Sequence, residues 1–415
     1  MAESFFFLFV FLKQFYLFDS GGIGIADVCM GICFVILFRI NNKRKNCLTK
    51  LKQEKYLMIF FGGVFLINSI YALKDGDWNY ELYVLYWGFN IASIWCFQEL
   101  CTKRFLSGIN CICKVNLILQ FGIYLTGYGR VFVENWGGRR YMGTFNDPNQ
   151  FAFYLFAMLL IICLYACYFK DITALLFYVI SILLIGESKS TGVFVGIIFL
   201  TVGMLMYGII KICRRKVLSK SIQICFIAII TVAVVMCLIL IIPPAYFDIH
   251  NTDYTMIARI QEKIWKVLYG NNSTILADRG LDKVILYPEY LIWGAGEGGF
   301  NRFALAVQQN EIHCSFINIW FCYGVVPLTM LGMWIGGKIK GLSTENLIIV
   351  VSLFAESLFL VNYRQPLFWM VIVYGSMVRE KMQDGENVCP NFWYMMKRKV
   401  YKINKSLRGL ELFMN

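Results

Sequence analysis

Two residues that could move a proton lie near the end of a long polar segment. Glu311 and His313 are separated by one residue, and an apolar run begins directly after His313. A histidine in this position can accept or release a proton near neutral pH, and a neighbouring carboxylate can orient or tune it. The pair is therefore a candidate catalytic site. Taken alone, an interfacial histidine is more often structural, so the interpretation needs support from other residues.

Basic residues beside turn-forming and hydrogen-bonding groups recur in four polar segments. The cationic candidates are Arg139, Arg140, Lys189, Arg279 and Arg364. Arginine offers a planar fork that matches phosphate oxygens, and lysine offers a compact charge. A diphosphate carried by a lipid is a natural partner for such a group. For any single residue, the alternative is a contact with lipid headgroups or with a nearby acidic side chain.

The elements that position these residues follow from composition. Of the 415 residues, 59% are hydrophobic and 16% are charged, and the mean hydropathy is +0.61. Soluble domains have roughly 45 to 50% apolar and about 25% charged residues, so much of this chain must face lipid. Repeated apolar runs without strand-like alternation predict helices, because backbone groups in hydrocarbon must be paired within their own segment. We expect an all-α polytopic membrane protein.

The apolar runs predict about twelve transmembrane helices. They lie at 4–18, 23–40, 56–73, 80–100, 106–127, 149–169, 171–187, 191–212, 220–247, 314–336, 345–361 and 366–378. The loops on the side of the N-terminus carry about twice as many basic residues as the loops on the other side, which predicts that both termini are cytoplasmic. The five cationic candidates then lie on the extracytoplasmic face.

This reading divides the chain into four parts. Residues 1–247 hold nine of the expected helices, 248–312 form a long external loop, 313–378 hold three more helices, and 379–415 form a basic cytoplasmic tail. Within the long loop, the spacing of apolar residues over 256–268 predicts an amphipathic helix. Long loops in compact proteins are usually functional or disordered, and the aromatic content here favours a folded lid.

Several other classes of function lack support. The net charge of +13 fits the basic loops of a membrane protein, so nucleic acid is not an expected partner. The cysteines lie mostly inside apolar runs and there are only two histidines, so we expect no metal, and the sequence points to no cofactor. Residues 294–299 match GxGxxG, but the segment lacks the flanking strand and helix of a dinucleotide site and is interpreted as a tight turn.

The polar segments resemble conserved segments of the O-antigen ligase and O-antigen polymerase superfamily of bacterial surface-glycan enzymes. The resemblance covers residues 140–330 and rests on an ordered set of short motifs. They are the segment 143–149, the segment 188–191, Arg279 followed by 293–296 and Phe300, and the segment 313–316 followed by 323–325. The specificity of the resemblance lies in the order of these motifs along the chain.

The resemblance implies an integral-membrane glycosyltransferase of the GT-C type that uses glycans on undecaprenyl diphosphate without a metal. His313 would be the general base, with Glu311 beside it. Lys189, Arg279 and Arg364, together with Arg139 or Arg140, would bind the diphosphate. Two positions depart from the family pattern, because Lys189 stands where arginine is common and Cys314 where asparagine is common. The first keeps the charge and loses the bidentate fork.

Three functions are compatible with these features. The leading hypothesis is a polymerase of lipid-linked repeat units in O-antigen or capsule synthesis, in a bacterial inner membrane with its active site on the extracytoplasmic face. A ligase that moves the finished glycan to a lipid, protein or wall acceptor shares the donor site. A transporter of such lipids is the third, although matching halves are not visible. Expected partners are the undecaprenyl diphosphate-linked glycan, membrane lipids, a chain-length regulator and a flippase.

Overall fold

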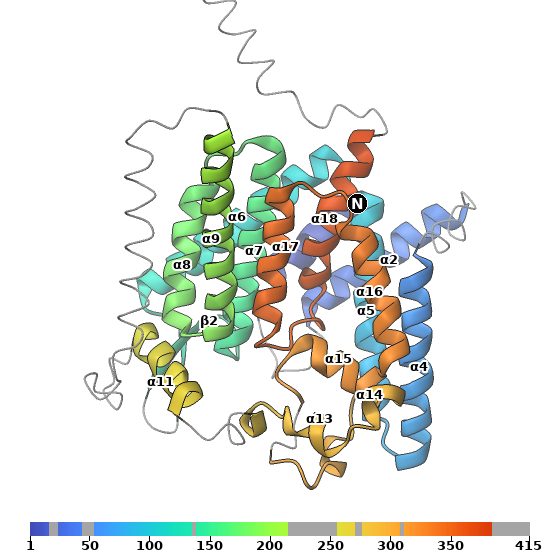
Figure 1. Cartoon of the computed structure of the whole chain (residues 1–415). Helices are drawn as coiled ribbons and strands as arrows, with labels where there is room; N and C mark the ends of the chain where they lie inside the picture. The colour runs from blue at the N-terminus through green and yellow to red at the C-terminus, as the bar shows by residue number, and fades with distance from the viewer. Residues whose placement is uncertain are drawn as a thin grey trace, which may run out of the picture.

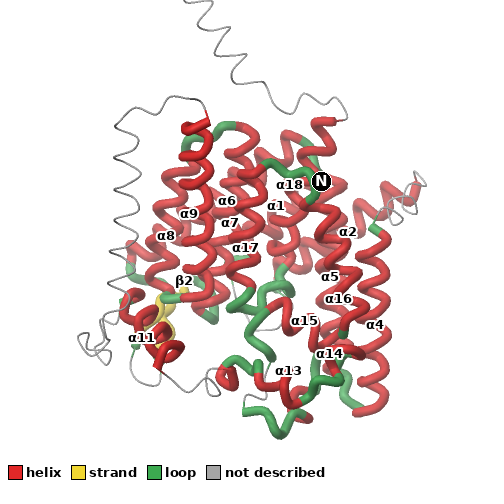
Figure 2. The backbone as a smooth tube through the Cα atoms, viewed as in Figure 1, coloured by secondary structure: helices red, strands yellow, loops and turns green. Residues whose placement is uncertain are grey.

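The computed structural model describes residues 1–15, 24–43, 54–134, 138–214, 255–269, 276–307 and 311–383. Within these ranges the chain is mostly helical (Figures 1 and 2). The elements are α1 (Ala2–Leu12), α2 (Ile25–Lys43), α4 (Lys55–Asp75), α5 (Asn79–Leu100), α6 (Lys103–Thr126), β1 (Arg130–Val133), β2 (Arg139–Gly143), α7 (Pro148–Phe169), α8 (Ala174–Ser188), α9 (Thr191–Arg214), α11 (Met256–Tyr269), α13 (Asp282–Leu286), α14 (Tyr290–Trp293), η2 (Phe300–Arg302), α15 (Ser315–Tyr323), α16 (Val325–Ile339), α17 (Thr344–Ser357) and α18 (Pro366–Gln383).

The long apolar helices identify a helical membrane protein. Among the described residues, α4, α6, α7 and α9 are each long and apolar enough to cross a bilayer. Large apolar side chains such as Leu66, Leu85 and Leu175 are more than half exposed on the outside of the bundle. Such surfaces are stable in hydrocarbon and not in water. The run at 220–247 and the tail at 384–415 lie outside the described residues, and the count of about twelve crossings stays a prediction.

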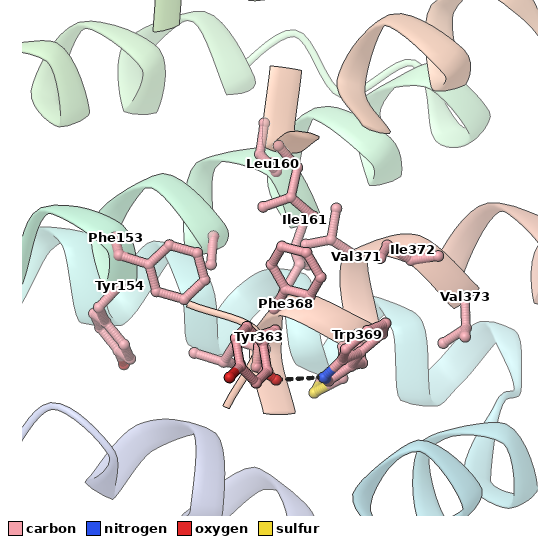
Figure 3. Close-up of a cluster of buried hydrophobic side chains, with 14 of the residues drawn as sticks. Phe153, Tyr154, Leu160, Ile161, Tyr363, Phe368, Trp369, Val371, Ile372 and Val373 are labelled. Carbon is pink, nitrogen blue, oxygen red and sulfur yellow. Dashed lines mark hydrogen bonds between the residues drawn. The ribbon is translucent and has the colours of Figure 1, made fainter. Parts of the chain in front are cut away.

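The centre of the bundle is formed by α7 and α18, which are apolar on every face. Nearly all side chains of α7 from Phe151 to Ile162 are buried, and so are those of α18 from Leu367 to Tyr374. Figure 3 shows side chains of both helices packed together, with the indole Nε1 of Trp369 donating to the carbonyl oxygen of Tyr363 at 2.6 Å. A helix surrounded by other helices has no need for a polar face. These two helices are the fixed frame for the polar segments at their ends.

The predicted run at 314–336 is two helices that meet at Gly324. A continuous helix would use the carbonyls of Phe321 and Cys322 for its own next turn. Here those carbonyls accept the N–H groups of Ala295 and Gly296, at 2.9 and 2.7 Å. Gly324 has φ 73° and ψ −178°, a conformation that only glycine adopts readily. The glycine-rich segment 294–299 therefore docks against the end of α15 and interrupts the helix.

A short hairpin that the all-α expectation omits connects α6 to α7. Its strands β1 and β2 are antiparallel, with Phe132 opposite Arg140 and Val133 opposite Arg139. Since successive side chains of a strand point to opposite faces, Arg139 is exposed and Arg140 is 6% exposed. The hairpin thus turns one of two adjacent arginines into the protein and the other outward.

The amphipathic helix expected in the long loop is α11. An amphipathic helix is expected to bury its apolar face, and α11 does so only in part. Ala258 and Gln261 are buried, whereas Ile257 is 45% exposed. The side of α11 that carries Arg259 and Lys263 contacts the helical bundle, as described below. The apolar residues do not all face inward, because the bundle presents polar groups to α11 at this end.

The break at Gly324 allows a test of this packing. A Cβ at Gly324 would collide with the carbonyl oxygen of Ile292 and with the backbone nitrogen of Gly294, and φ 73° would be strained. We expect Gly324→Ala to destabilise the protein by about 1 to 3 kcal/mol, measured as a lower midpoint of thermal unfolding in detergent. Gly332→Ala is the control, because its Cβ would meet nothing within 4 Å. Equal midpoints for the two variants would contradict this packing.

Candidate functional site

The structure brings the candidate residues to one end of the bundle. Arg139 and Arg140 lie on β2, Lys189 ends α8, and Arg364 lies two residues before the start of α18. The segment from Arg279 to α15 covers the same end, together with α11 (Figure 1). This segment contains α13, α14, Glu311 and His313. Residues that are far apart in the sequence are neighbours here, so their contacts can be followed one by one.

Arg140 joins the hairpin to the end of α8 and to the start of α7. Its Nε donates to the carbonyl oxygen of Ser188 at 3.0 Å, and one terminal nitrogen donates to Oδ1 of Asn149 at 2.8 Å. The same amide oxygen accepts the hydroxyl of Ser190 at 3.0 Å. Burial and the nearby Arg259 lower the pKa of Arg140 to about 10. Arg140 therefore holds the hairpin against the helices and also contributes a positive charge.

Lys189 ends α8 in the left-handed conformation, with φ 54°, which is unusual for a residue other than glycine. Its ammonium donates to the carbonyl oxygen of Arg139 at 2.5 Å. This contact holds the turn between α8 and α9 against β2. The Arg139 side chain itself points away from the buried residues and is exposed.

Two further cations come from α11, and together with two predicted ones they form a cationic cluster. We use this name for Arg140, Arg259, Lys263 and Arg279. Arg259 lies 2.8 Å from the carboxylate of Glu134, which is also 3.5 Å from Arg140. Burial, followed by Arg259, Arg279 and Arg140, lowers the pKa of Lys263 to about 7. Four cations thus gather around few acidic groups.

The hydrogen bonds of Lys263 and Arg279 within the part of the chain that the structure describes go to uncharged groups. The Lys263 ammonium donates to the hydroxyl of Thr191, the first residue of α9. The Arg279 guanidinium makes a long hydrogen bond of 3.5 Å to the carbonyl oxygen of Phe359, and its centre lies 5.1 Å from that residue's ring. Burial lowers the pKa of Arg279 as well. Both groups would gain free energy from a neighbouring anion.

Arg279 also connects the cationic cluster to His313. The backbone N–H of His313 donates to the carbonyl oxygen of Arg279 at 2.9 Å. Burial lowers the pKa of the His313 imidazole, and the positive charges of Arg279 and Lys283 lower it further, while Glu311 opposes them. The imidazole is consequently neutral at pH 7, which is the form that can accept a proton.

Beside His313 lies an ionic array that sequence analysis did not predict. We use this name for Glu297, Arg364 and Glu311. Glu297 is fully buried, and its carboxylate lies 2.5 Å from one terminal nitrogen of Arg364 and 2.8 Å from its Nε. The remaining nitrogen of Arg364 lies 2.5 Å from the carboxylate of Glu311. The hydroxyls of Tyr363, at 2.5 Å, and Tyr323 also donate to Glu297.

This array changes the interpretation of Arg364 and Glu311. The sequence reading assigned Arg364 to diphosphate binding, but a diphosphate would have to compete with two carboxylates for it. The guanidinium is also held 4.8 Å from the ring of Tyr83. Glu311 is engaged as the second partner of Arg364, and it acts on His313 through charge. In this geometry both residues position the segment that carries His313.

Sequence analysis missed Glu297, Arg259 and Lys263 as candidates. Glu297 was part of a segment interpreted only as a turn, and its only signal was an acidic residue among five small ones in a chain with few charges. Arg259 and Lys263 counted only as polar residues of the expected amphipathic helix. Their spacing of four residues, which puts two cations on one side of a helix, was the available signal.

The ionic array predicts a non-additive effect of mutation. Glu297→Gln leaves a buried guanidinium without its main partner, and we expect a loss of about 3 kcal/mol in stability. Adding Arg364→Gln removes the unpaired charge, so the double variant should be more stable than the sum of the single effects implies. Thermal unfolding of the four proteins of this cycle, in one detergent, measures the coupling. Strict additivity would mean that the two side chains do not interact.

Comparison of this chain with protein-family models, with curated proteins and with solved structures finds no match. The likeness of the short motifs to O-antigen ligases and polymerases therefore stays a prediction.

Proposed function

We propose that this chain is a membrane glycosyltransferase that uses a glycan linked to a lipid diphosphate, and that it polymerises repeat units of a bacterial surface polysaccharide. The observation that carries the proposal is the adjacency of the cationic cluster and a neutral His313, joined through Arg279. Anion binding and proton transfer would then occur at neighbouring points at one end of a membrane protein.

The cationic cluster supports a polyanionic ligand held at the membrane surface. Repulsion among buried cations is relieved when an anion binds, and a diphosphate can contact several cations at once. A polyprenyl tail would remain in the bilayer while its diphosphate lies at the level of α11 and β2. Of the predicted ligands, Lys189, Arg279 and Arg140 keep this role in the proposal, Arg139 stands at the rim, and Arg259 and Lys263 join them.

The proposed reaction is a displacement at the anomeric carbon of the donor. The acceptor hydroxyl forms the new glycosidic bond, and His313 takes the proton of that hydroxyl. The bond between the anomeric carbon and the diphosphate oxygen breaks, and the lipid diphosphate leaves with the electron pair. The cationic cluster stabilises the charge that develops on the leaving group. Attack from the opposite side inverts the configuration.

The alternatives are a ligase and a transporter. A ligase would share the donor site and differ in its acceptor, which could be a lipid, a protein or the wall. A transporter for lipid-linked glycans would use the cationic cluster without a proton acceptor. The proposal further places the protein in the inner membrane, with a GT-C type fold, about twelve crossings and the cationic cluster on the extracytoplasmic face. A chain-length regulator and a flippase are its expected partners.

A strain that lacks the protein tests the proposal directly. Mass spectrometry of undecaprenyl-linked glycans should find single repeat units accumulated and long chains missing. Long chains that remain on the carrier lipid would indicate the ligase instead. Unchanged pools of both kinds would contradict both enzymes and favour transport.

The role of His313 is tested in the same strain. His313→Ala removes the proposed base, and we expect chain extension to fall by about 10²- to 10⁴-fold with normal protein levels in the membrane. Cys314→Ser is the control, since it changes the adjacent buried position without removing the imidazole. Extension at the normal rate by His313→Ala would remove this residue from the mechanism.

The low pKa of Lys263 predicts how diphosphate binding depends on pH. Binding an anion raises this pKa, so affinity is constant below about pH 7 and falls by up to tenfold per unit as the pH rises above it. The probe is a diphosphate substituted at both ends, because its own charge does not change in this range. Isothermal titration from pH 6 to 9 measures the effect.

Two variants separate Lys263 from general changes in charge. Lys263→Met should bind the probe more weakly and lose the pH dependence. Lys74→Met removes an exposed lysine from the end of α4 that lies beside η2 and should leave both properties unchanged. A pH dependence that persists in Lys263→Met would assign the titration to another group.

A further inference from the structure

A recess of about 450 Å³ lies between α6, the end of α7 and the segment that leads into α8. Its lining includes Asn110, Lys114, Tyr165, Phe169 and Asp171. Because α6 begins and α7 ends here, while the β1–β2 hairpin joins their other ends, the recess is at the end of the bundle opposite to the cationic cluster. Neither the proposed function nor the ionic array uses it.

A charged pair faces this recess. Lys114 forms an ion pair with Asp171 and donates to the hydroxyl of Thr173 at 2.7 Å. The side chains of Lys114 and Asp171 are 18% and 17% exposed. The Asp171 carboxylate is saturated, since its other oxygen accepts the backbone N–H and the hydroxyl of Thr173 at 3.1 and 2.7 Å. An ammonium has three N–H donors, so Lys114 keeps one for a further acceptor.

A buried acceptor lies next to this pair. Asn110 is 5% exposed, and its Nδ2 donates to Asp171 at 3.2 Å, which fixes the orientation of the amide. Its Oδ1 receives no hydrogen bond from the described residues. A buried carbonyl oxygen without a donor costs free energy. Protein atoms cover this oxygen, so a ligand in the recess that offers an O–H or N–H group would remove that cost once the side chains around the oxygen separate.

The charge around the recess favours an anion. Lys103, Arg104 and Lys170 are exposed near its rim, and the Lys103 ammonium lies 5.9 Å from the ring of Phe169. With Lys114 they make four cations around the carboxylate of Asp171. Farther along α6 and on the first turns of α8, several apolar side chains are exposed, namely Val115, Ile118, Leu175, Leu176 and Val179. A polar, cationic recess thus continues into an apolar surface.

We propose that this recess binds an anionic phospholipid whose headgroup carries a hydroxyl, with phosphatidylglycerol as the simplest example. Lys114 contacts the phosphate, a headgroup hydroxyl donates to Oδ1 of Asn110, and the acyl chains lie along α6 and α8. Basic recesses between membrane helices are suited to anionic headgroups. With the basic loops inside, this lipid belongs to the cytoplasmic leaflet.

The test uses the full protein in nanodiscs with equal amounts of phosphatidylglycerol, phosphatidylethanolamine and phosphatidylcholine, followed by native mass spectrometry of the retained lipid. Phosphatidylcholine has the phosphate but no net charge and no hydroxyl or N–H donor. We expect about fivefold more phosphatidylglycerol than phosphatidylcholine, the effect of about one lysine contact. Lys114→Met and Asn110→Leu should each reduce this ratio, and Lys340→Met, an exposed lysine at the same end, should not.

Each other outcome contradicts a stated part of the proposal. Equal retention of phosphatidylglycerol and phosphatidylcholine overturns the site, and a preference that survives both recess variants overturns its location. Phosphatidylethanolamine retained as strongly as phosphatidylglycerol overturns the choice of an anionic lipid. Displacement by soluble glycerophosphoglycerol at equal concentration overturns the role of the acyl chains. Asn110→Leu changes no charge, so it remains informative if Lys114→Met fails to insert into the membrane.

Discussion

A carboxylate buried in the interior of a membrane protein needs a positive partner and several hydrogen-bond donors, because desolvation makes an isolated charge very costly. Glu297 obtains these from residues of α15 and from Tyr363 and Arg364 in the connection before α18, while its backbone N–H donates to Asn68 of α4 at 2.9 Å. Glu297 thereby anchors the long polar segment to α4, to α15 and to the connection before α18. The positions of Glu311 and His313 follow from this anchor.

The cationic cluster is held by a different kind of contact. Arg140 and the neighbouring Lys189 each donate to a backbone carbonyl, and Arg140 also donates to the amide of Asn149; such contacts orient the cations without cancelling their charge. Glu134 forms ion pairs with two cluster members, Arg140 and Arg259. The resulting excess of positive charge destabilises the empty site and favours a polyanion, which is the usual balance between stability and function at a binding site.

The positive charge of a buried lysine is compensated differently at the two ends of the bundle. Lys114 is compensated by Asp171 within the protein, and its spare donor is available for one phosphate group. Lys263 is surrounded by cations, so its proton is held weakly at neutral pH. The first arrangement suits a resident lipid. The second suits a ligand that must arrive with its own negative charge and later leave.

Much of the helical framework could be predicted from the sequence alone. Apolar runs locate helices because every backbone group in hydrocarbon must be paired locally, and each predicted run within the described residues coincides with a helix or, at Gly324, with two. The sequence also determined that Lys189, Arg279 and His313 belong to polar segments. Tertiary structure decided which of these residues meet, that Arg364 is bound by Glu297 and Glu311, and that α11 turns its charged side toward the bundle. Those outcomes depend on partners distant in the chain, and local periodicity carries no information about them.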